Sequence, residues 1–209
     1  MAAIRNVIFD LSEVLLTGIK DTGHALREHH GIDLASVVDG TMGSRNPLML
    51  PSVWDFFHGK ISEDAYVAEV VRVYPQFGPH EDLKARIREN FCEVEGTRDI
   101  VKRVRELGYR LALLSVHGRE WIEHCDAIHD IHSLFHVVAY SYEEGVSKPQ
   151  PEAFLDVLKR LEAKPEECLF IDDSEKNVVA AQALGITSIR FINAEMLESQ
   201  LLYTLPDFH

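Results

Sequence analysis

The sequence predicts an α/β protein with a doubly wound parallel sheet and an inserted helical segment. From Gly96 onwards, short apolar segments alternate with amphipathic segments of about ten residues, which is typical of the strand–helix units of a parallel sheet. Residues 17–95, by contrast, contain helix-like segments and no convincing strand. A chain of 209 residues is long enough for one sizeable core that carries such an insertion.

The first predicted strand, 7–9, is an apolar run that ends at Asp10 and is followed by a turn. A segment that opens at Ser62 has an N-cap residue and an acidic first turn, and Gly31, Gly108 and Gly185 end other helical segments. A Gly- and Pro-rich loop is expected at 40–47. The remaining strands are expected at 110–115, 136–140, 168–171 and 187–191, and the remaining helices at 22–30, 51–58, 80–91, 97–107, 119–131, 151–161 and 177–184.

Composition narrows the classes of partner and the compartment. The net charge of −13 disfavours nucleic acid and anionic membranes as partners. No apolar run approaches the ~18 residues of a membrane helix, and the first strand begins too early to leave room for a signal peptide. Cys92, Cys125 and Cys168 lack metal-binding or disulfide spacing, so we expect buried thiols in a reducing, cytoplasmic setting.

Chemically active side chains recur where predicted strands end. Asp10 follows the first strand, Ser115 ends the second, Lys148 lies in the loop after the third, and the pair Asp172-Asp173 ends the fourth. Each also has an ordinary structural use as a turn residue, a helix cap or a solvated charge. Because open α/β sheets bind ligands beyond the carboxyl ends of their strands, their coincidence at one edge indicates a functional site.

These residue types suit phosphoryl transfer. Carboxylates at two strand ends suit Mg²⁺, which is typically held by one or two carboxylates together with substrate oxygens. An Asp carboxylate is able to attack phosphorus and form an aspartyl-phosphate. A hydroxyl, a lysine and backbone N–H groups would hold the phosphate, and in this chain Ser115 and Lys148 are the candidates for the side chains.

Four stretches resemble the four motifs of the haloacid dehalogenase superfamily, over nearly the whole chain. They are 9–15, 113–115, 148–149 and 170–177, the last reinforced by 180–181 and 184–186. The resemblance implies a Rossmann-like core formed by 1–16 and 95–209, with a helical cap at 17–94. It also implies a Mg²⁺-dependent phosphomonoesterase that acts on a small phosphate, with sugar phosphates among the candidates. We expect a monomer or a homodimer.

The resemblance assigns a role to each residue. Asp10 is the nucleophile, and Ser115 and Lys148 hold the phosphate together with the backbone amides of Leu11 and Val116. Asp173 is the main metal ligand of the fourth motif, and Asp172 supports it. Asp10 and the backbone carbonyl of Ser12 complete the metal site.

Ser12 departs from the family pattern. Family phosphatases usually carry a second Asp at this position, as the acid for the leaving alcohol and then the base for water. Serine does not titrate near neutral pH, and general acid–base assistance contributes ~10²–10⁴-fold. Family members with a small residue here include sugar-1-phosphate phosphatases, whose anomeric leaving group needs little protonation. His117 and Glu13 are alternative proton donors, although sequence favours a surface turn for His117 and a different direction for Glu13.

Three further questions stay open on sequence alone. Trp54, Phe56 and Phe57 would line a substrate pocket or pack in the cap, and their helical spacing favours packing. A metal-independent dehalogenase-type hydrolase would share the fold and the nucleophile, but it would have no use for the acidic pair of the fourth motif. A catalytically weakened binding or regulatory protein would explain Ser12, but not the retention of all four motifs.

Overall fold

The computed structural model describes residues 3–31 and 46–209, and in them five parallel strands form one sheet in the order β3-β2-β1-β4-β5. The central strand, β1, pairs with β2 on one side and with β4 on the other. Because all strands run in the same direction, their carboxyl ends lie along one edge. The strands are β1 (Asn6–Phe9), β2 (Arg110–Ser115), β3 (Val137–Tyr140), β4 (Cys168–Asp172) and β5 (Thr187–Arg190).

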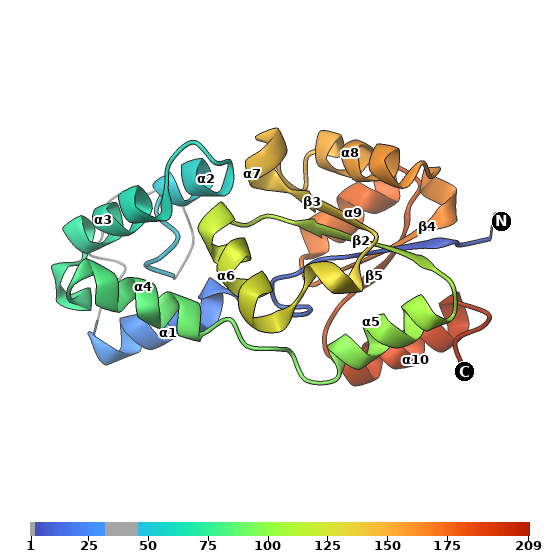
Figure 1. Ribbon diagram of the computed structural model, residues 1–209, viewed down its shortest axis with the longest axis horizontal. Coiled ribbons are helices and arrows are strands. Elements are labelled where there is room, and N and C mark those ends of the chain that lie inside the picture. The colour runs from blue at the N-terminus through green and yellow to red at the C-terminus, as the bar shows by residue number, and fades with distance from the viewer. Residues whose placement is uncertain (1–2, 32–45) are drawn as a thin grey trace.

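Helices cover both faces of the sheet (Figure 1). The side chains of β1 alternate between two apolar cores, since Val7 and Phe9 belong to one and Ile8 to the other. Helices α8 and α9 contribute to the core of Ile8, and α5, α6 and α10 contribute to the other. The bounds are α5 (Thr97–Glu106), α6 (Arg119–His129), α7 (Ser141–Glu144), α8 (Pro151–Leu161), α9 (Glu175–Ala183) and α10 (Ala194–Thr204).

In the described parts of 17–94, four helices follow β1. They lie together at one end of the molecule, beyond the carboxyl end of that strand (Figure 1). The chain enters and leaves this helical segment through two adjacent stretches. The N–H of Thr17 donates to Cys92 O (2.8 Å), and the N–H of Val94 donates to Leu15 O (2.8 Å). The helices are α1 (Ile19–His29), α2 (Ser52–Phe57), α3 (Glu63–Val73) and α4 (His80–Glu89). The division into a core and a cap domain stays a prediction.

A buried polar contact joins the helical segment to α6. Glu63 of α3 is 2% exposed, and its carboxylate accepts the indole N–H of Trp121 (2.7 Å) and the Nε–H of Arg88 (3.1 Å). Trp121 is fully buried, with its ring edge-to-face on Phe56 of α2. The contact satisfies a buried carboxylate, which would otherwise carry a large desolvation cost.

The predicted elements are present, and most of their ends differ by one to three residues. The bounds 110–115 of β2 and 151–161 of α8 are confirmed. Helix α1 begins three residues before the predicted start because Gly18 is the extended residue at its N-cap. Helix α9 begins two residues early, after Ser174. Of the predicted loop 40–47, residues 40–45 lie outside the described part of the chain.

Helix α10 was not predicted. Its apolar side chains lie on both faces, since Leu197 and Leu201 are buried whereas Met196 and Tyr203 are exposed, and this hides the helical periodicity. Its N-cap is regular: the side chain of Asn193 accepts the N–H of Met196 (2.8 Å).

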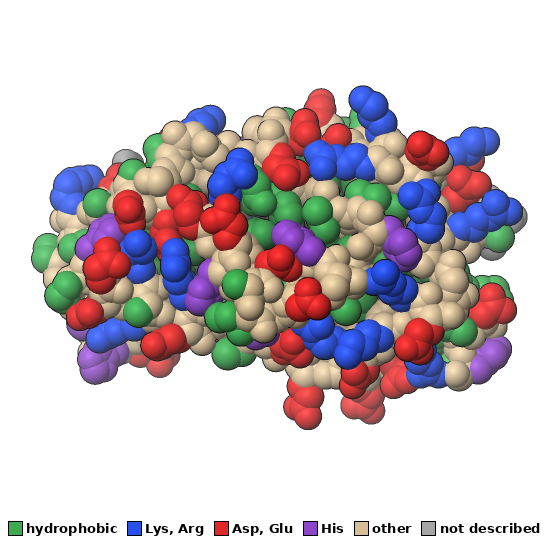
Figure 2. All heavy atoms as spheres, in the orientation of Figure 1, with side chains coloured by type: hydrophobic (Ala, Val, Ile, Leu, Met, Phe, Trp, Pro, Cys, Tyr) green, Lys and Arg blue, Asp and Glu red, His purple; other side chains and the backbone are tan. Residues whose placement is uncertain are grey.

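The three cysteines are free thiols, as predicted. Cys125 and Cys168 are buried, but the prediction of burial is wrong for Cys92, which lies exposed on the return stretch beside Thr17. No helix within 3–31 or 46–209 has the length and apolar character needed to cross a membrane. Figure 2 shows Lys and Arg side chains interspersed with Asp and Glu over the face that it presents.

Candidate active site

Asp10 lies directly beyond β1, where the sheet still fixes its backbone. Its N–H donates to Ile171 O (2.9 Å), and its Oδ1 accepts the N–H of Leu11 (2.7 Å). A tight turn follows, in which Leu11 O accepts the N–H groups of Leu15 and Leu16. Glu13 takes a left-handed conformation in this turn (φ 61°). The sheet and the turn therefore hold the Asp10 carboxylate at the carboxyl edge.

Lys148 lies between two carboxylates of neighbouring strands. Its Nζ is 2.8 Å from Asp10 Oδ1 and 2.7 Å from Asp172 Oδ2, and the side chain is 1% exposed. The ammonium group also lies 5.5 Å from the centre of the Phe170 ring. Burial alone would lower the pKa of Lys148, but the charges of Asp10 and Asp172 and their hydrogen bonds outweigh it, so the pKa is raised. The lysine is therefore a fixed positive charge.

Asp172 is fully buried, and its carboxylate is saturated. Besides Lys148, it accepts the N–H of Ser174 (2.8 Å) and the side-chain amide of Asn177 (3.0 Å to each oxygen). These bonds fix it as the residue that orients Lys148. Among the described residues, no other side chain binds the carboxylate of Asp173, which is half-buried beside it. Asn177 is the last residue of the fourth motif, and the resemblance assigns it no role.

Negative charge exceeds positive charge in this cluster. Asp10, Asp172 and Asp173 each offer an oxygen, and these oxygens lie within 4.8 Å of one another. Burial, together with the charge of Asp172, raises the pKa of both Asp10 and Asp173. Against three carboxylates the cluster holds one lysine. The donor set and the excess of two negative charges fit one hard divalent cation.

The other three predicted phosphate-binding positions differ in their surroundings. The N–H of Leu11 already donates to Asp10 Oδ1 (2.7 Å). Ser115 ends β2 with 1% exposure, and its Oγ finds no hydrogen-bond partner among the described residues. It lines a small hollow beside the cluster, with Ser147 and Lys148, rather than the main cavity. Val116 lines the main cavity. A buried hydroxyl without a partner beside Lys148 is the kind of group that a bound anion would satisfy.

A cavity of about 430 Å³ opens from the cluster towards the helical segment. Asp10, Lys148 and Asp173 line one end of it. Further lining residues come from the first turn and α1, from 46–54 and α2, and from α6. They are Ser12, Glu13, Gly18, Ile19, Lys20, His24, Asn46, Met49, Trp54, Phe57, Val116, His117, Trp121 and Asn177. Its volume is within the ordinary range for a small-molecule site.

The surface-turn interpretation of His117 is wrong. The residue is 4% exposed and lines the cavity. The backbone N–H of His117 donates to the buried hydroxyl of Ser141 (3.1 Å), and this bond holds the residue in its inward position. Burial lowers the pKa of His117 to about 4, so the ring is neutral at neutral pH. Glu13 also lines the cavity, although its Oε1 accepts the N–H of Gly18 (3.1 Å).

The aromatic residues of α2 divide between packing and cavity. Phe56 is 1% exposed and packs in the core, as its helical spacing predicted. Phe57 is also buried but reaches the cavity, and Trp54 lines it with 37% of its surface exposed. Trp121 and Glu63 were not singled out from the sequence, because they are 58 residues apart and no local pattern connects them.

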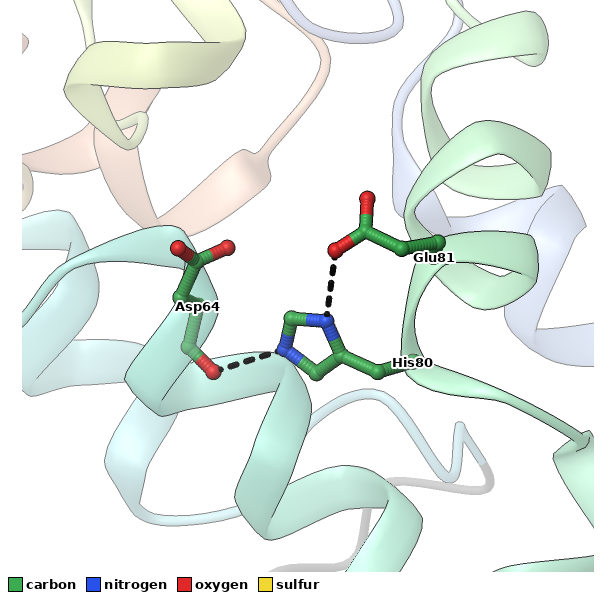
Figure 3. Close-up of side chains that lie close together, drawn as sticks. All are labelled: Asp64, His80 and Glu81. Atoms are coloured by element: carbon green, nitrogen blue, oxygen red, sulfur yellow. Dashed lines mark hydrogen bonds and ion pairs between the residues drawn. The ribbon is translucent and has the colours of Figure 1, made fainter.

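A second group of potential metal ligands lies between α3 and α4 (Figure 3). Its histidine is already bound on both sides: His80 Nδ1 is 3.2 Å from Glu81 Oε1, and Nε2 is 2.9 Å from Asp64 O. Lys84 Nζ lies 2.7 Å from Asp64 Oδ1. These contacts describe an exposed ion-pair network that joins two helices.

Comparisons with known proteins agree with the four motifs. A family model described as haloacid dehalogenase-like hydrolase matches residues 4–185. Pyrophosphatase PpaX of Bacillus thuringiensis (strain Al Hakam) is 30% identical over 140 residues, which are 66% of this chain and 61% of that protein. The chain thus spans less than two thirds of the length of this relative.

Solved structures show the same fold. A mutant form of the HAD family enzyme bt-2542 from Bacteroides thetaiotaomicron, in complex with magnesium and inorganic phosphate, has a TM-score of 0.73 at 20% identity, over 91% of this chain and 95% of that one. L-2-haloacid dehalogenase from Xanthobacter autotrophicus, with chloropropionic acid covalently bound, has a TM-score of 0.62 at 15% identity, over 96% and 83%.

Proposed function

The chain belongs to the haloacid dehalogenase-like hydrolases, and on this premise we propose that it is a Mg²⁺-dependent phosphatase of small phosphorylated molecules. The observation that carries the proposal is the buried cluster, in which Lys148 lies 2.8 Å from Asp10 and 2.7 Å from Asp172. It combines a nucleophile, a fixed cation and spare carboxylate charge at the end of a cavity.

Mg²⁺ is the cation that we assign to the cluster. Asp10, Asp173 and the backbone carbonyl of Ser12 would hold it, while Asp172 keeps its bonds to Lys148 and Asn177. When bound, the ion would supply positive charge against the phosphate oxygens and the carboxylates. Asp173 suits the role of main ligand because, among the described residues, no other side chain occupies its carboxylate.

In the proposed reaction a carboxylate oxygen of Asp10 attacks phosphorus. The bond from Asp10 to phosphorus forms, the ester P–O bond breaks, and the leaving oxygen takes the electron pair and then a proton from solvent. Water then attacks the phosphorus of the aspartyl-phosphate, which frees Asp10 and inorganic phosphate and returns a proton to solvent. Lys148 donates to the phosphoryl oxygens, and the unpartnered hydroxyl of Ser115 is a second donor.

Ser12 leaves the usual acid–base position without a titrating group. We expect turnover to be lower than with an acid by part of the ~10²–10⁴-fold that such groups contribute. His117 does not replace the acid as an imidazolium, because burial lowers its pKa to about 4. The enzyme should therefore favour substrates whose leaving group departs without much protonation.

The comparisons support this proposal over its alternatives. PpaX is named a pyrophosphatase, and bt-2542 was crystallised with magnesium and inorganic phosphate. A metal-independent dehalogenase is the second candidate, since L-2-haloacid dehalogenase shares the fold. The two excess negative charges around Asp10 disfavour it, because such charge hinders attack by a carboxylate unless a cation compensates it. A binding or regulatory protein is the third candidate.

The test is hydrolysis of phenyl phosphate by the purified chain with Mg²⁺ and with a chelator. We expect turnover only when Mg²⁺ is present. The Asp173→Asn variant should need a much higher Mg²⁺ concentration for the same turnover. The matched control is Asp64→Asn, which removes a carboxylate from the exposed network of α3 and α4. Full turnover in chelator would favour metal-independent chemistry, and no turnover of any phosphate ester would favour the binding protein.

A further inference from the structure

We propose that the substrate is an aryl phosphate, the ester of a small phenol, whose flat ring lies against Trp54 and Phe57. This inference rests on the proposed phosphatase function, and it replaces the sugar suggested by the family resemblance. Two independent features of the cavity lead to it: the character of its outer wall and the missing acid at its inner end.

The outer wall of the cavity is built of aromatic rings. Trp54 lines the cavity and keeps 37% of its surface exposed, so part of this large apolar side chain is open to a ligand. Phe57 meets it edge-to-face, with ring centres 6.0 Å apart. Ile19 and Met49 add further apolar surface to the same cavity. A flat ring entering beyond the phosphate would gain both hydrophobic burial and aromatic contact.

The wall is also fixed in place. Phe57 lies 6.2 Å from His117 and 5.9 Å from Trp121, measured between ring centres. The indole of Trp121 is held by its 2.7 Å hydrogen bond to the buried Glu63. The backbone carbonyl of Phe57 accepts the hydroxyl of Ser141 (2.6 Å). Because these contacts already order the side chains of the wall, little side-chain entropy is lost when a ligand binds.

The described lining of the cavity is mostly apolar, and such a lining suits a sugar poorly. Each sugar hydroxyl that is buried without a partner carries a desolvation cost, so sugar sites present several free polar groups. Asn46 is committed to local structure, since its amide donates to Ile19 O (2.9 Å) and its Oδ1 accepts the N–H of Leu48 (2.9 Å). Ser12, Lys20 and His24 also line the cavity. The neutral ring of His117 adds a buried Nδ1 that has no partner among the described residues, and it suits one polar substituent on a ring.

The inner end of the cavity leads to the same class of substrate. Ser12 supplies no acid, and Glu13 is bound to the N–H of Gly18. A phenolic oxygen leaves as an aryl oxide, with the electron pair of its P–O bond, and takes its proton from solvent afterwards. An aliphatic alkoxide is far more basic and needs protonation as it leaves. An aromatic ester thus fits both the wall and the missing acid.

The test separates ring recognition from leaving-group chemistry. Benzyl phosphate and cyclohexylmethyl phosphate both release a primary alcohol, and they differ in having a flat or a puckered ring. We expect the parent enzyme to prefer the benzyl ester about three- to tenfold in kcat/KM, the range that one aromatic contact supplies. Trp54→Ala should remove this preference, and Trp54→Phe should keep most of it.

Tyr203→Ala is the matched control, because Tyr203 is 93% exposed on α10 and contributes nothing to the cavity. The Tyr203→Ala variant should prefer benzyl phosphate over cyclohexylmethyl phosphate as strongly as the parent does. If the parent hydrolyses both esters equally, or if Trp54→Ala keeps the preference, the inference is overturned while the phosphatase function stands.

Binding without turnover completes the test. Phenylphosphonate and methylphosphonate, neither of them hydrolysable, are titrated into the Mg²⁺-loaded enzyme by calorimetry. We expect phenylphosphonate to bind about three- to tenfold more tightly, and this margin to vanish in Trp54→Ala. If the margin is found but no ester is hydrolysed, the aromatic site stands and the phosphatase function fails. If neither phosphonate binds and no ester is hydrolysed, both proposals fail.

Discussion

Replacing Lys148 by methionine should destabilise the metal-free protein more than any exposed charge change. Lys148→Met keeps the length of the side chain but leaves Asp10, Asp172 and Asp173 without their positive neighbour. At an effective dielectric constant of about 20, the contacts at 2.8 and 2.7 Å each supply roughly 6 kcal/mol of gross attraction. Desolvation offsets much of this, and removing one partner of a buried pair costs about 3–5 kcal/mol.

Urea denaturation with and without Mg²⁺ measures this loss. In chelator we expect the free energy of unfolding to fall by about 3–5 kcal/mol. Mg²⁺ binding stabilises both proteins, but the variant has lost the lysine charge that competes with the ion, so we expect it to bind Mg²⁺ more tightly. Each tenfold difference in Kd at saturating Mg²⁺ narrows the gap by about 1.4 kcal/mol. Lys60→Met is the control, because its pair with Asp55 is exposed (63% and 51%) and such pairs contribute about 0–1 kcal/mol.

The pH dependence gives the sign of the effect. Burial raises the pKa of Asp10 and Asp173 above the ordinary 3.8, so the folded state binds protons more readily than the unfolded chain. Stability therefore falls as pH rises from about 4 through the raised pKa values, and it should fall more steeply in Lys148→Met. A variant as stable as the parent in chelator at neutral pH, or a gap that Mg²⁺ leaves unchanged, would refute this view of the cluster.

Substitutions at two further places test the vacant acid position and the contact between α3 and α6. Ser12→Asp should raise kcat/KM for benzyl phosphate, up to the ~10²–10⁴-fold of general acid–base assistance, and change phenyl phosphate less. If Ser12→Asp slows the hydrolysis of both esters and His117→Ala abolishes most of the parent's activity, then His117 already supplies the acid. Glu63→Ala should lower the free energy of unfolding by about 3–5 kcal/mol in urea, because Arg88 and the indole of Trp121 lose their buried acceptor. Glu63→Gln, which still accepts from Trp121, should cost less, and equal losses would contradict this account of the contact.

The sequence predicted the sheet and its functional edge because both depend on local signals. Apolar runs mark buried strands, and parallel strands bring their ends together, so Asp10, Lys148 and Asp172 were predicted at one edge before any distance was known. The Lys148 bridge itself was not predicted, because it depends on how a loop closes over two strands. The roles assigned to these residues stay predictions.

The outer cavity could not be derived from local patterns. The inward turn of His117 depends on the hydroxyl of Ser141, which follows another strand. The pairing of Glu63 with Trp121 joins two helices across 58 positions of sequence, and each residue alone is an ordinary helix residue. Helical spacing correctly placed Phe56 in the core, but it could not show that Trp54 faces a cavity, because that depends on how α2 packs against α6.

Capture of the covalent intermediate is the most direct test of Asp10 as nucleophile. The protein is mixed with phenyl phosphate carrying ³²P and Mg²⁺, quenched in acid within milliseconds, and digested. We expect a hydroxylamine-sensitive label on the peptide that contains Asp10, and neither label nor turnover in Asp10→Asn. A label on another residue, or Asp10→Asn turning over within tenfold of the parent rate, would contradict the proposed mechanism.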